Sequence, residues 1–399
     1  MRPAVLSAAR YGAVAASSIA LSILGWSAPG TEDVADIWLP WMDAVARHGL
    51  IKGYAEIGGD YPPAAAALLF AARRLLPAAS DLTVVKALLA TAQLISTLLF
   101  AAFCRRTGPS LCFVAAVALS ASSLGYLDIL FTAPLVVALF AALDKRPALS
   151  ATAFTLTCLV KWQPLILLPF LLPLWIEQAR KVSIGHIALA AGPSLAICAA
   201  IALGFWPAIW LAFGQAFAHG IWSADALNLP WLLQVAVGLS PQVMEVPDRA
   251  ILALRLLFAA IYLPLVVRAL SRRGSAEDTL THALAGFATY FMLAPSVHEN
   301  HLFTAMVLAF VLWARDPSKA WPALGIALFA NLNLVVFYGL AGAVPFSPGP
   351  RFALLTGALS AVATGAFCYG LYRLIAGSPA RDSPTGSAGG PSATAAGNR

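Results

Sequence analysis

Long apolar runs alternate with short charged segments along this chain, and this pattern leaves few folds open to it. A run of about 20 apolar residues is long enough to cross the hydrocarbon core of a bilayer as a helix. Hydrophobic residues make up 60% of the chain and charged residues 11%, and the mean hydropathy is +0.81. A soluble domain cannot hide so much apolar surface, because its exterior must be wetted. The sequence therefore predicts an all-α protein embedded in a membrane.

The apolar runs predict a bundle of about 12 transmembrane helices. The expected spans are 11–28, 82–103, 109–127, 129–143, 147–163, 164–179, 184–205, 249–270, 279–297, 300–314, 320–341 and 351–373. The first run follows Arg2 and Arg10, as in a signal peptide, but the many later runs favour an uncleaved span. Together they predict one membrane domain at 1–375. The Ser-, Gly-, Pro- and Ala-rich residues 376–399 predict a disordered cytoplasmic tail.

Basic residues predict the orientation, because loops on the cytoplasmic side of membrane proteins are enriched in Lys and Arg. Every second loop is basic if the N-terminus is cytoplasmic, and both termini are then inside. The basic clusters are Arg2/Arg10, Arg105/Arg106, Lys145/Arg146, Arg180/Lys181, Arg268/Arg272/Arg273, Arg315/Lys319 and Arg373/Arg381. This distribution accounts for the net charge of +7 and gives no basic groove with stacking aromatics, so a nucleic-acid partner is not expected.

The five cysteines predict neither disulfides nor a zinc site. Their number is odd, all lie in or beside apolar runs, and no Cys-x-x-Cys spacing occurs. We interpret them as small residues of the core.

Two outer segments, 28–81 and 206–248, are too long to be simple turns, and long loops are where function tends to be built. In the first segment, residues 40–48 predict a short helix with Pro40 in its first turn. Residues 64–76 predict an apolar helix too short to span the membrane, which ends in Arg73 and Arg74. That composition is typical of a helix lying at the membrane surface.

Asp36, directly after the first span, is the candidate catalytic residue. A carboxylate near the membrane surface can accept the proton of an attacking hydroxyl group. The alternative is a solvated or helix-capping acid, since Pro40 follows closely. Asp33 and Asp43 could take the same catalytic role.

Two further motifs on the outer side contain candidate binding residues. Asp60 and Tyr61 precede two prolines, a pattern that also fits a turn followed by the start of a helix. Lys161 and Gln163 flank a tryptophan near the outer end of a predicted span. Lys161 could bind a phosphate there, or its side chain could extend to the polar interface without a ligand.

The outer loop 296–301 holds Ser296, His298, Glu299 and a second histidine. Ser296 and Glu299 fit a helix capping box, while the histidines beside a helix N-terminus fit an anion site. Two histidines and one glutamate could also hold a divalent metal, although this spacing is a weak signal for one. Asp128 and Arg255 are the remaining ionisable candidates near the outer side, where charged groups are functional candidates by default.

With these motifs in order, the chain resembles the GT-C superfamily of membrane glycosyltransferases. The closest resemblance is to the dolichyl- and polyprenyl-phosphate-glucose-dependent glucosyltransferases and their bacterial relatives. It rests on Asp36-Ile-Trp-Leu-Pro-Trp, Asp60-Tyr-Pro-Pro and Val-His298-Glu over about residues 30–310, and on Lys161 and Gln163 with a later proline. The family's lysine after His-Glu is Asn300 here.

The resemblance implies an inverting transfer of a hexose from a polyprenyl-phosphate carrier to an acceptor hydroxyl at the outer face of the membrane. Asp36 would be the general base, and Lys161, His298 and Arg255 would neutralise the phosphate. The partners would be the lipid-linked donor and a glycan or glycolipid acceptor, in a bacterial inner membrane with the active site facing the periplasm. Phosphate is already a fair leaving group, so no cofactor is required, and a divalent metal remains an open alternative.

Two alternative functions stay open on the sequence. A polyprenyl-phosphomannose-dependent mannosyltransferase would share the same motifs. A secondary transporter or flippase would share the many spans and the cytoplasmic termini, but it would concentrate polar groups near the bilayer midplane, whereas here they gather on one face.

Overall fold

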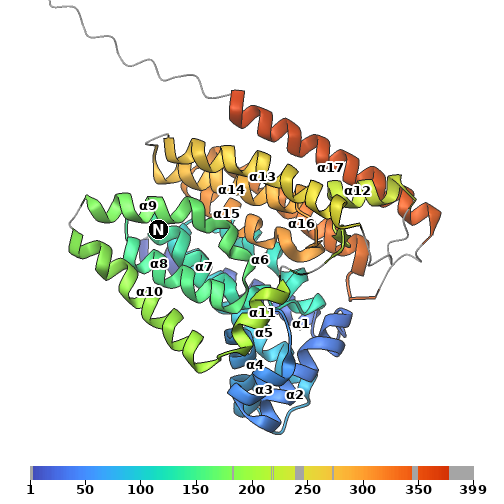
Figure 1. Cartoon of the computed structure of the whole chain (residues 1–399). Coiled ribbons are helices and arrows are strands. Elements are labelled where there is room, and N and C mark those ends of the chain that lie inside the picture. Colours follow the sequence, from blue (N-terminus) through green and yellow to red (C-terminus); the bar gives the residue numbers. More distant parts are fainter. Residues whose placement is uncertain are drawn as a thin grey trace, which may run out of the picture.

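The structure is a computed structural model that describes residues 3–181, 184–216, 218, 220–238, 247–271, 274–343 and 349–376. Nearly all of them are helical, as the apolar runs predict (Figure 1). In the first half of the chain the elements are α1 (Pro3–Leu24), η1 (Val34–Trp38), α2 (Leu39–His48), α3 (Leu50–Ile57), α4 (Pro63–Leu75), α5 (Asp81–Cys104), α6 (Thr107–Ala118), η2 (Leu119–Leu124), α7 (Asp128–Leu143), α8 (Pro147–Val160), η3 (Gln163–Leu167) and α9 (Leu168–Arg180).

The second half of the chain continues the bundle and adds one short pair of strands. Its elements are α10 (Ile184–Gly204), α11 (Ala208–Ala216), β1 (Ser223–Ala224), α12 (Leu229–Ala236), α13 (Asp248–Ser271), α14 (Ala276–Leu293), β2 (Val297–His298), η4 (Glu299–Leu302), α15 (Phe303–Arg315), η5 (Pro317–Lys319), α16 (Ala320–Tyr338) and α17 (Pro350–Ala376). Apart from Ala376, the predicted tail at 376–399 lies outside the described residues.

The protein is an α-helical membrane protein, but the structure does not give it 12 spans. In the described residues, six helices are long and apolar enough to cross a bilayer, or seven if the bent pair α10–α11 is one span. The predicted spans at 129–143, 147–163, 164–179 and 300–314 become helices of 16, 14, 13 and 13 residues, shorter than the roughly 20 that a crossing needs.

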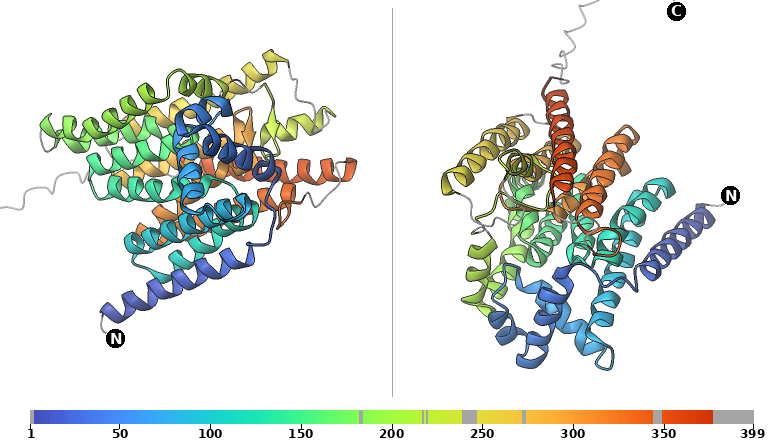
Figure 2. Two further views of the ribbon diagram at one scale, coloured as in Figure 1. Left: turned by 90° about the horizontal axis from the view of Figure 1, so that it is seen from below. Right: turned by 90° about the vertical axis from the view of Figure 1, so that its right-hand side faces the viewer.

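The extra predicted spans arise because helices in the centre of the bundle are as apolar as helices that face lipid. Every residue of α15 from Phe303 to Ala314 is buried, and most of α7 is buried as well. A helix that is apolar all round is the form expected for a core. Close ring packing holds this core together: Phe100 stacks on Phe113 at 4.3 Å, and Phe310 meets Phe113 edge-on at 5.5 Å. α1 and α17 lie at the periphery (Figure 2).

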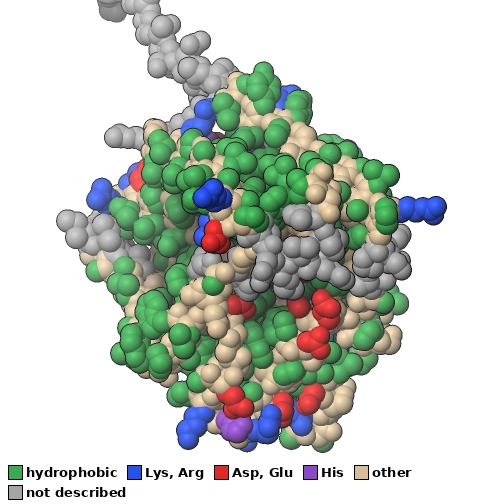
Figure 3. All heavy atoms as spheres, turned by 45° about the vertical axis from the view of Figure 1, so that its right-hand side comes forward, with side chains coloured by type: hydrophobic (Ala, Val, Ile, Leu, Met, Phe, Trp, Pro, Cys, Tyr) green, Lys and Arg blue, Asp and Glu red, His purple; other side chains and the backbone are tan. Residues whose placement is uncertain are grey.

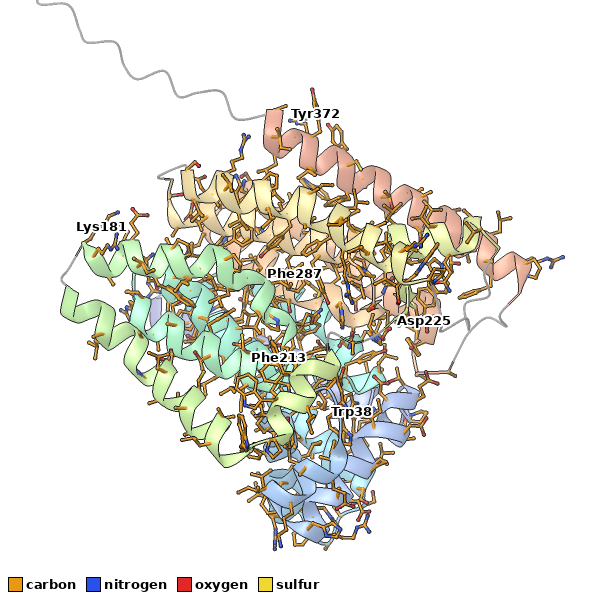
Figure 4. All side chains as sticks on the ribbon, viewed as in Figure 1. Trp38, Lys181, Phe213, Asp225, Phe287 and Tyr372 are labelled. Atoms are coloured by element: carbon orange, nitrogen blue, oxygen red, sulfur yellow. The ribbon has the colours of Figure 1, made fainter. Side chains whose placement is uncertain are left out.

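The two ends of the bundle have different chemistry. The basic loops pack against one another at one end, where Arg106 donates to the carbonyl of Trp313 at 3.2 Å, Arg315 pairs with Asp144, and Gln178 donates to the carbonyl of Ala142 at 2.8 Å. In Figure 4, Lys181 at this basic end lies far from Trp38 and Asp225. We call the opposite end, where α7 and α15 begin and where α1, α8, α14 and α16 finish, the polar end.

The segments between α1 and α5 and between α10 and α13 cover the polar end. α2 and α4 match the helices predicted at 40–48 and 64–76, and α4 ends in Arg73 and Arg74. α11 turns by 106° from α10 and packs its buried face, Ile209 and Ala212, with Tyr54 of α3. Further on, β1 pairs in parallel with β2, with Ser223 opposite Val297. Both segments therefore reach the residues singled out by the sequence.

Candidate functional site

The candidate residues gather at the polar end because successive helices run in opposite directions, so every second helix end lies on the same side of the bundle. Asp128 begins α7, Lys161 directly follows α8, and Glu299 begins η4, just before α15. Asp33 precedes η1, beyond the end of α1. Antiparallel neighbours bring these four ends together, so residues far apart in the sequence meet in one site. Figure 3 shows acidic side chains gathered over the lower part of one face of the molecule.

A buried ion pair lies at the centre of the site. Asp128 is fully buried, and one of its carboxylate oxygens accepts a hydrogen bond from the Lys161 ammonium at 2.9 Å. Its other oxygen accepts from the Asn300 amide at 3.0 Å. The Lys161 ammonium also lies 5.5 Å from the centroid of the Tyr61 ring, over its face. A buried charge needs such partners because it has lost its water.

Glu299 forms a second buried group beside this pair. It accepts a hydrogen bond from the Tyr126 hydroxyl, and burial raises the pKa of its carboxyl group well above the usual value. Asn333 donates to the carbonyl of Glu299 at 2.7 Å and accepts from the backbone N–H of Leu227 at 2.7 Å. Asn333 thereby fixes the 220–228 segment to the loop that contains Glu299.

The capping-box alternative for the loop 296–301 is wrong. Ser296 donates to the carbonyl of Ile221 at 3.1 Å, and its backbone N–H donates to the carbonyl of Trp222 at 3.1 Å. The N-cap residue of η4 is His298, and its side chain makes no capping hydrogen bond. Ser296 therefore anchors the outer segment rather than capping a helix.

Asp33 is held in the site by the tight turn that follows α1. The N–H of Thr31 donates to the carbonyl of Leu124 at 2.9 Å, which ties the turn to the end of η2. Gly30 and Gly125 both have positive φ, and a Cβ atom on either would lie 2.5 Å from Cγ2 of Val34. Glycine at these two positions allows Val34 to insert between them, and this contact sets the start of η1 next to Asp33.

Asp33 is half-buried and electrostatically coupled to the ion pair. Burial raises the pKa of Asp33 to about 6. Lys161 opposes this rise, whereas the carboxylates of Glu32, Asp128 and Asp60 add to it. A carboxylate with this pKa is ionised at neutral pH but binds protons more readily than an ordinary aspartate, which suits a general base.

Asp36 does not join this group. Its side chain is exposed, and within the described residues it forms no hydrogen bond or ion pair. η1 is a π-helical turn in which Val34 and Trp38 are the buried residues, and Asp36 lies between them on the outer surface. Of the three acids that the sequence offered as a base, Asp33 is the one with an electrostatic interaction with Lys161, whereas Asp43 pairs with Arg47 at the surface.

The other sequence candidates lie around the ion pair. Gln163 donates to the carbonyl of His301 at 2.8 Å, and Nδ1 of His301 lies 2.9 Å from the Tyr290 hydroxyl. The rings of His298 and His301 are 5.1 Å apart. Asp60 is half-buried and acts electrostatically on Asp33 and Tyr61.

Arg255 is exposed on α13, one helical turn before Phe258. The ring centroids of Phe258 and Tyr290 are 6.2 Å apart, and the Tyr290 hydroxyl is hydrogen-bonded to His301. α13 therefore packs through Phe258 beside the histidine side of the site.

Two residues of the polar end were not among the predicted site residues. Asp225 has a positive φ of 54°, and burial raises its pKa to about 6, with Glu32 adding to the rise and a hydrogen bond from Tyr338 opposing it. Lys86 is buried in α5, and its ammonium donates to the carbonyls of Gly25, Ser122 and Ser123 at 3.3, 2.7 and 3.1 Å. It joins the ends of α1 and η2, and so supports the turn that holds Asp33. A lysine within an apolar span was the sequence signal that could have found it.

Among the described residues, no group of three or more His, Cys, Asp and Glu side chains is arranged to hold a metal ion. His298 and His301 approach each other, but Glu299 is engaged with Tyr126 instead.

Comparison with known proteins gives the site no name. No protein-family model matches the chain, and no curated protein matches it.

Proposed function

We propose that this chain is an inverting glycosyltransferase of the GT-C kind, which moves a hexose from a polyprenyl-phosphate carrier to an acceptor hydroxyl at the polar end of the bundle. One observation supports this function best. Asp33, a half-buried carboxylate with a pKa raised to about 6, lies within electrostatic reach of Lys161, at the boundary of a membrane-embedded bundle. A base and a cation in one interfacial site match the two charges that develop in such a transfer.

Asp33 acts as the general base in this proposal, in place of the exposed Asp36. The acceptor hydroxyl loses its proton to Asp33 as its oxygen attacks the anomeric carbon of the sugar. The bond between that carbon and the phosphate oxygen breaks, and the electron pair leaves with the polyprenyl phosphate. Attack on the face opposite the phosphate inverts the anomeric centre.

The phosphate leaves toward the cationic side of the site. Lys161 provides a charge there whose position is fixed by Asp128 and Asn300. In this proposal His298 and Arg255 complete this side, where hydrogen-bond donors and positive charge stabilise the developing phosphate dianion. Asp60 and Tyr61 orient the donor or the acceptor, since Tyr61 packs edge-on against Trp38 and Trp41 at 5.3 and 5.5 Å.

Transport is the competing function, and the location of the polar groups favours transfer. A transporter would place its ionisable groups near the bilayer midplane, between broken helices. Asp33, Asp128, Lys161 and Glu299 lie at helix ends, and the inner stretches of α7 and α15 that continue from this site are apolar. We expect the site to face the outer side of a bacterial inner membrane, opposite the basic loops.

A donor panel tests the proposed function. Protein reconstituted in liposomes is incubated with polyprenyl phosphates that carry glucose, mannose or aminoarabinose, and the free carrier is measured. We expect release from one donor, with mannose selecting the mannosyltransferase alternative. Movement of a labelled lipid or sugar across the bilayer, with no carrier released from any donor, would instead identify a transporter.

A further inference from the structure

A small cavity lies beside the buried ion pair, where α6, η2, η4, α15 and α16 meet in the middle of the bundle (Figure 1). Its volume is about 10 Å³, which is room for one water molecule and too little for a larger ligand. Ser120 of η2 lines it together with Glu299 and Asn300 of η4. The rest of the wall is mostly apolar and includes Ala116 and Leu334. We call it the η2–η4 cavity.

Two residues of this wall have polar atoms without partners. The Ser120 hydroxyl and the Asn300 amide oxygen form no hydrogen bond among the described residues, although these residues are only 1% and 6% exposed. An unpaired polar atom at such depth costs free energy, and native proteins retain few of them. Because both residues line the same cavity, one ligand can reach both atoms. A water molecule fits their chemistry, since it accepts from the Ser120 hydroxyl and donates to the Asn300 oxygen.

Glu299 offers a third partner on the same wall. The Tyr126 hydroxyl donates to one of its carboxylate oxygens, so the other oxygen can accept the second hydrogen of a water in the cavity. Buried waters in globular proteins typically make about three hydrogen bonds. The three polar residues therefore match the needs of one water molecule.

A metal ion fits the η2–η4 cavity less well than water does. Hard cations take about six or more oxygen ligands, and Mg²⁺ demands a nearly ideal octahedron of them. Only four of the nine residues that line the cavity have polar side chains, so a bare cation would lack ligands there. Water needs only two to four polar partners. The composition of the wall thus favours water.

We propose that the η2–η4 cavity holds one buried water molecule that is hydrogen-bonded to Ser120, Glu299 and Asn300. Asn300 also donates to Asp128 at 3.0 Å, and Asp128 accepts from the Lys161 ammonium at 2.9 Å. The water extends this buried chain to Ser120 on η2, and so holds the Asn300 amide from its second side. The water site depends on this local geometry alone, and it stands whether or not the protein transfers a sugar.

Paired serine substitutions in the full-length protein test the water site. Ser96 of α5 is the control, because its buried hydroxyl also lacks a partner among the described residues but does not line the cavity. Ser96→Ala removes an unpaired hydroxyl and should leave the midpoint of thermal unfolding in detergent unchanged or raise it. Ser120→Ala removes a hydrogen bond to the water and should lower the midpoint by about 2 °C. A midpoint that rises or stays constant in Ser120→Ala would overturn the proposal.

A double-mutant cycle shows whether Ser120 and Asn300 share one ligand. The two unpaired atoms are not hydrogen-bonded to each other, so a coupling between them must pass through what lies in the cavity. In the background of Asn300→Ala the water has already lost a partner, and Ser120→Ala should then lower the midpoint by less than about 1 °C. The same loss in both backgrounds would contradict a shared water.

Two measurements on the wild-type protein complete the test. An experimental structure that resolves ordered waters should show a single peak in the cavity, about 3 Å from both the Ser120 hydroxyl and the Asn300 amide oxygen. An empty cavity in such a structure would overturn the proposal. The midpoint of thermal unfolding should be the same in sodium chloride and in choline chloride at equal concentration. A midpoint that sodium raises in the wild type but not in Ser120→Ala would identify a cation in place of the water.

Discussion

The basic end of this helix bundle and the centre of its polar site differ in how deeply their ion pairs are buried. At the basic end, ion pairs lie at the surface: Lys181 and Glu177 have side chains that are 71% and 48% exposed. At the polar end, Asp128 and Lys161 form their pair with side chains that are 0% and 8% exposed. Exposed pairs contribute little to stability because water and salt screen them. A buried pair requires further partners. Asn300 donates a hydrogen bond to Asp128, and the Tyr61 ring lies against the Lys161 ammonium.

This difference matters for the proposed function, which requires a charge held in a fixed position at the polar end. The charges at the basic end can set orientation in the membrane without any fixed geometry, because the positive-inside rule depends on the number of charges. The charges at the polar end have fixed partners and are buried, which costs free energy that a purely structural bundle end could avoid. A fixed arrangement of base and cation is what a catalytic site requires.

The largest effect is expected from removal of the base. Asp33→Asn keeps the size of the side chain but removes the carboxylate, and the transfer rate should fall by about 10²–10⁴-fold. Asp36→Asn is the matched control, because that side chain is exposed three residues later. Its rate should stay close to wild type in the same assay of carrier release. Equal losses in the two variants would remove the distinction between the acids.

The next effect compares the two ends directly. Lys161→Ala leaves Asp128 buried without its counter-charge and should destabilise the protein by about 3–5 kcal/mol, whereas Lys181→Ala should change stability by less than about 1 kcal/mol. Denaturation of both variants in detergent micelles measures the difference. Similar stabilities would mean that water reaches Asp128, and the buried ion pair would not describe the native site.

A smaller effect is expected from Asn333→Ala, which removes the bridge between Glu299 and Leu227. Loss of two buried hydrogen bonds should destabilise the protein by about 1–3 kcal/mol and lower activity with it. The control is Asn331→Ala on the same helix, which loses hydrogen bonds to the carbonyls of Ala116 on α6 and Ala327 on its own helix but does not touch the 220–228 segment. Transfer rates that respond to Asn331→Ala as strongly as to Asn333→Ala would argue against a specific role for the bridge.

The helical class could be predicted from the sequence, and so could the meeting of Asp128, Lys161 and Glu299 at one end, but the residue chosen as the base, Asp36, lies outside the group. Apolar runs determine helices in a bilayer because every backbone group must be paired within the segment. The alternation of basic loops then places Asp128, Lys161 and Glu299 on one side, and the structure brings these residues to the same end. The mutual contacts depend on packing between helices, so the Asp128–Lys161–Asn300 hydrogen bonds could not be read from spacing.

Three features escaped prediction for identifiable physical reasons. Core helices such as α15 are as apolar as spans that face lipid, so the predicted number of spans was too high. The π-helical turn η1 breaks the usual helical spacing, so spacing led to Asp36, although Asp33 is the half-buried acid of the two. Asn333 contacts partners far away in the chain, and an asparagine within an apolar run does not identify them.

The pH dependence of transfer tests the role of Asp33 most directly. Since the pKa of Asp33 is raised to about 6, the base is ionised above that pH and protonated below it. Single-turnover transfer should level off above about pH 6 and fall about tenfold for each pH unit below, and the residual rate of Asp33→Asn should lack this dependence. A wild-type rate that is flat across this range, or a slope that persists in Asp33→Asn, would contradict Asp33 as the group that accepts the proton.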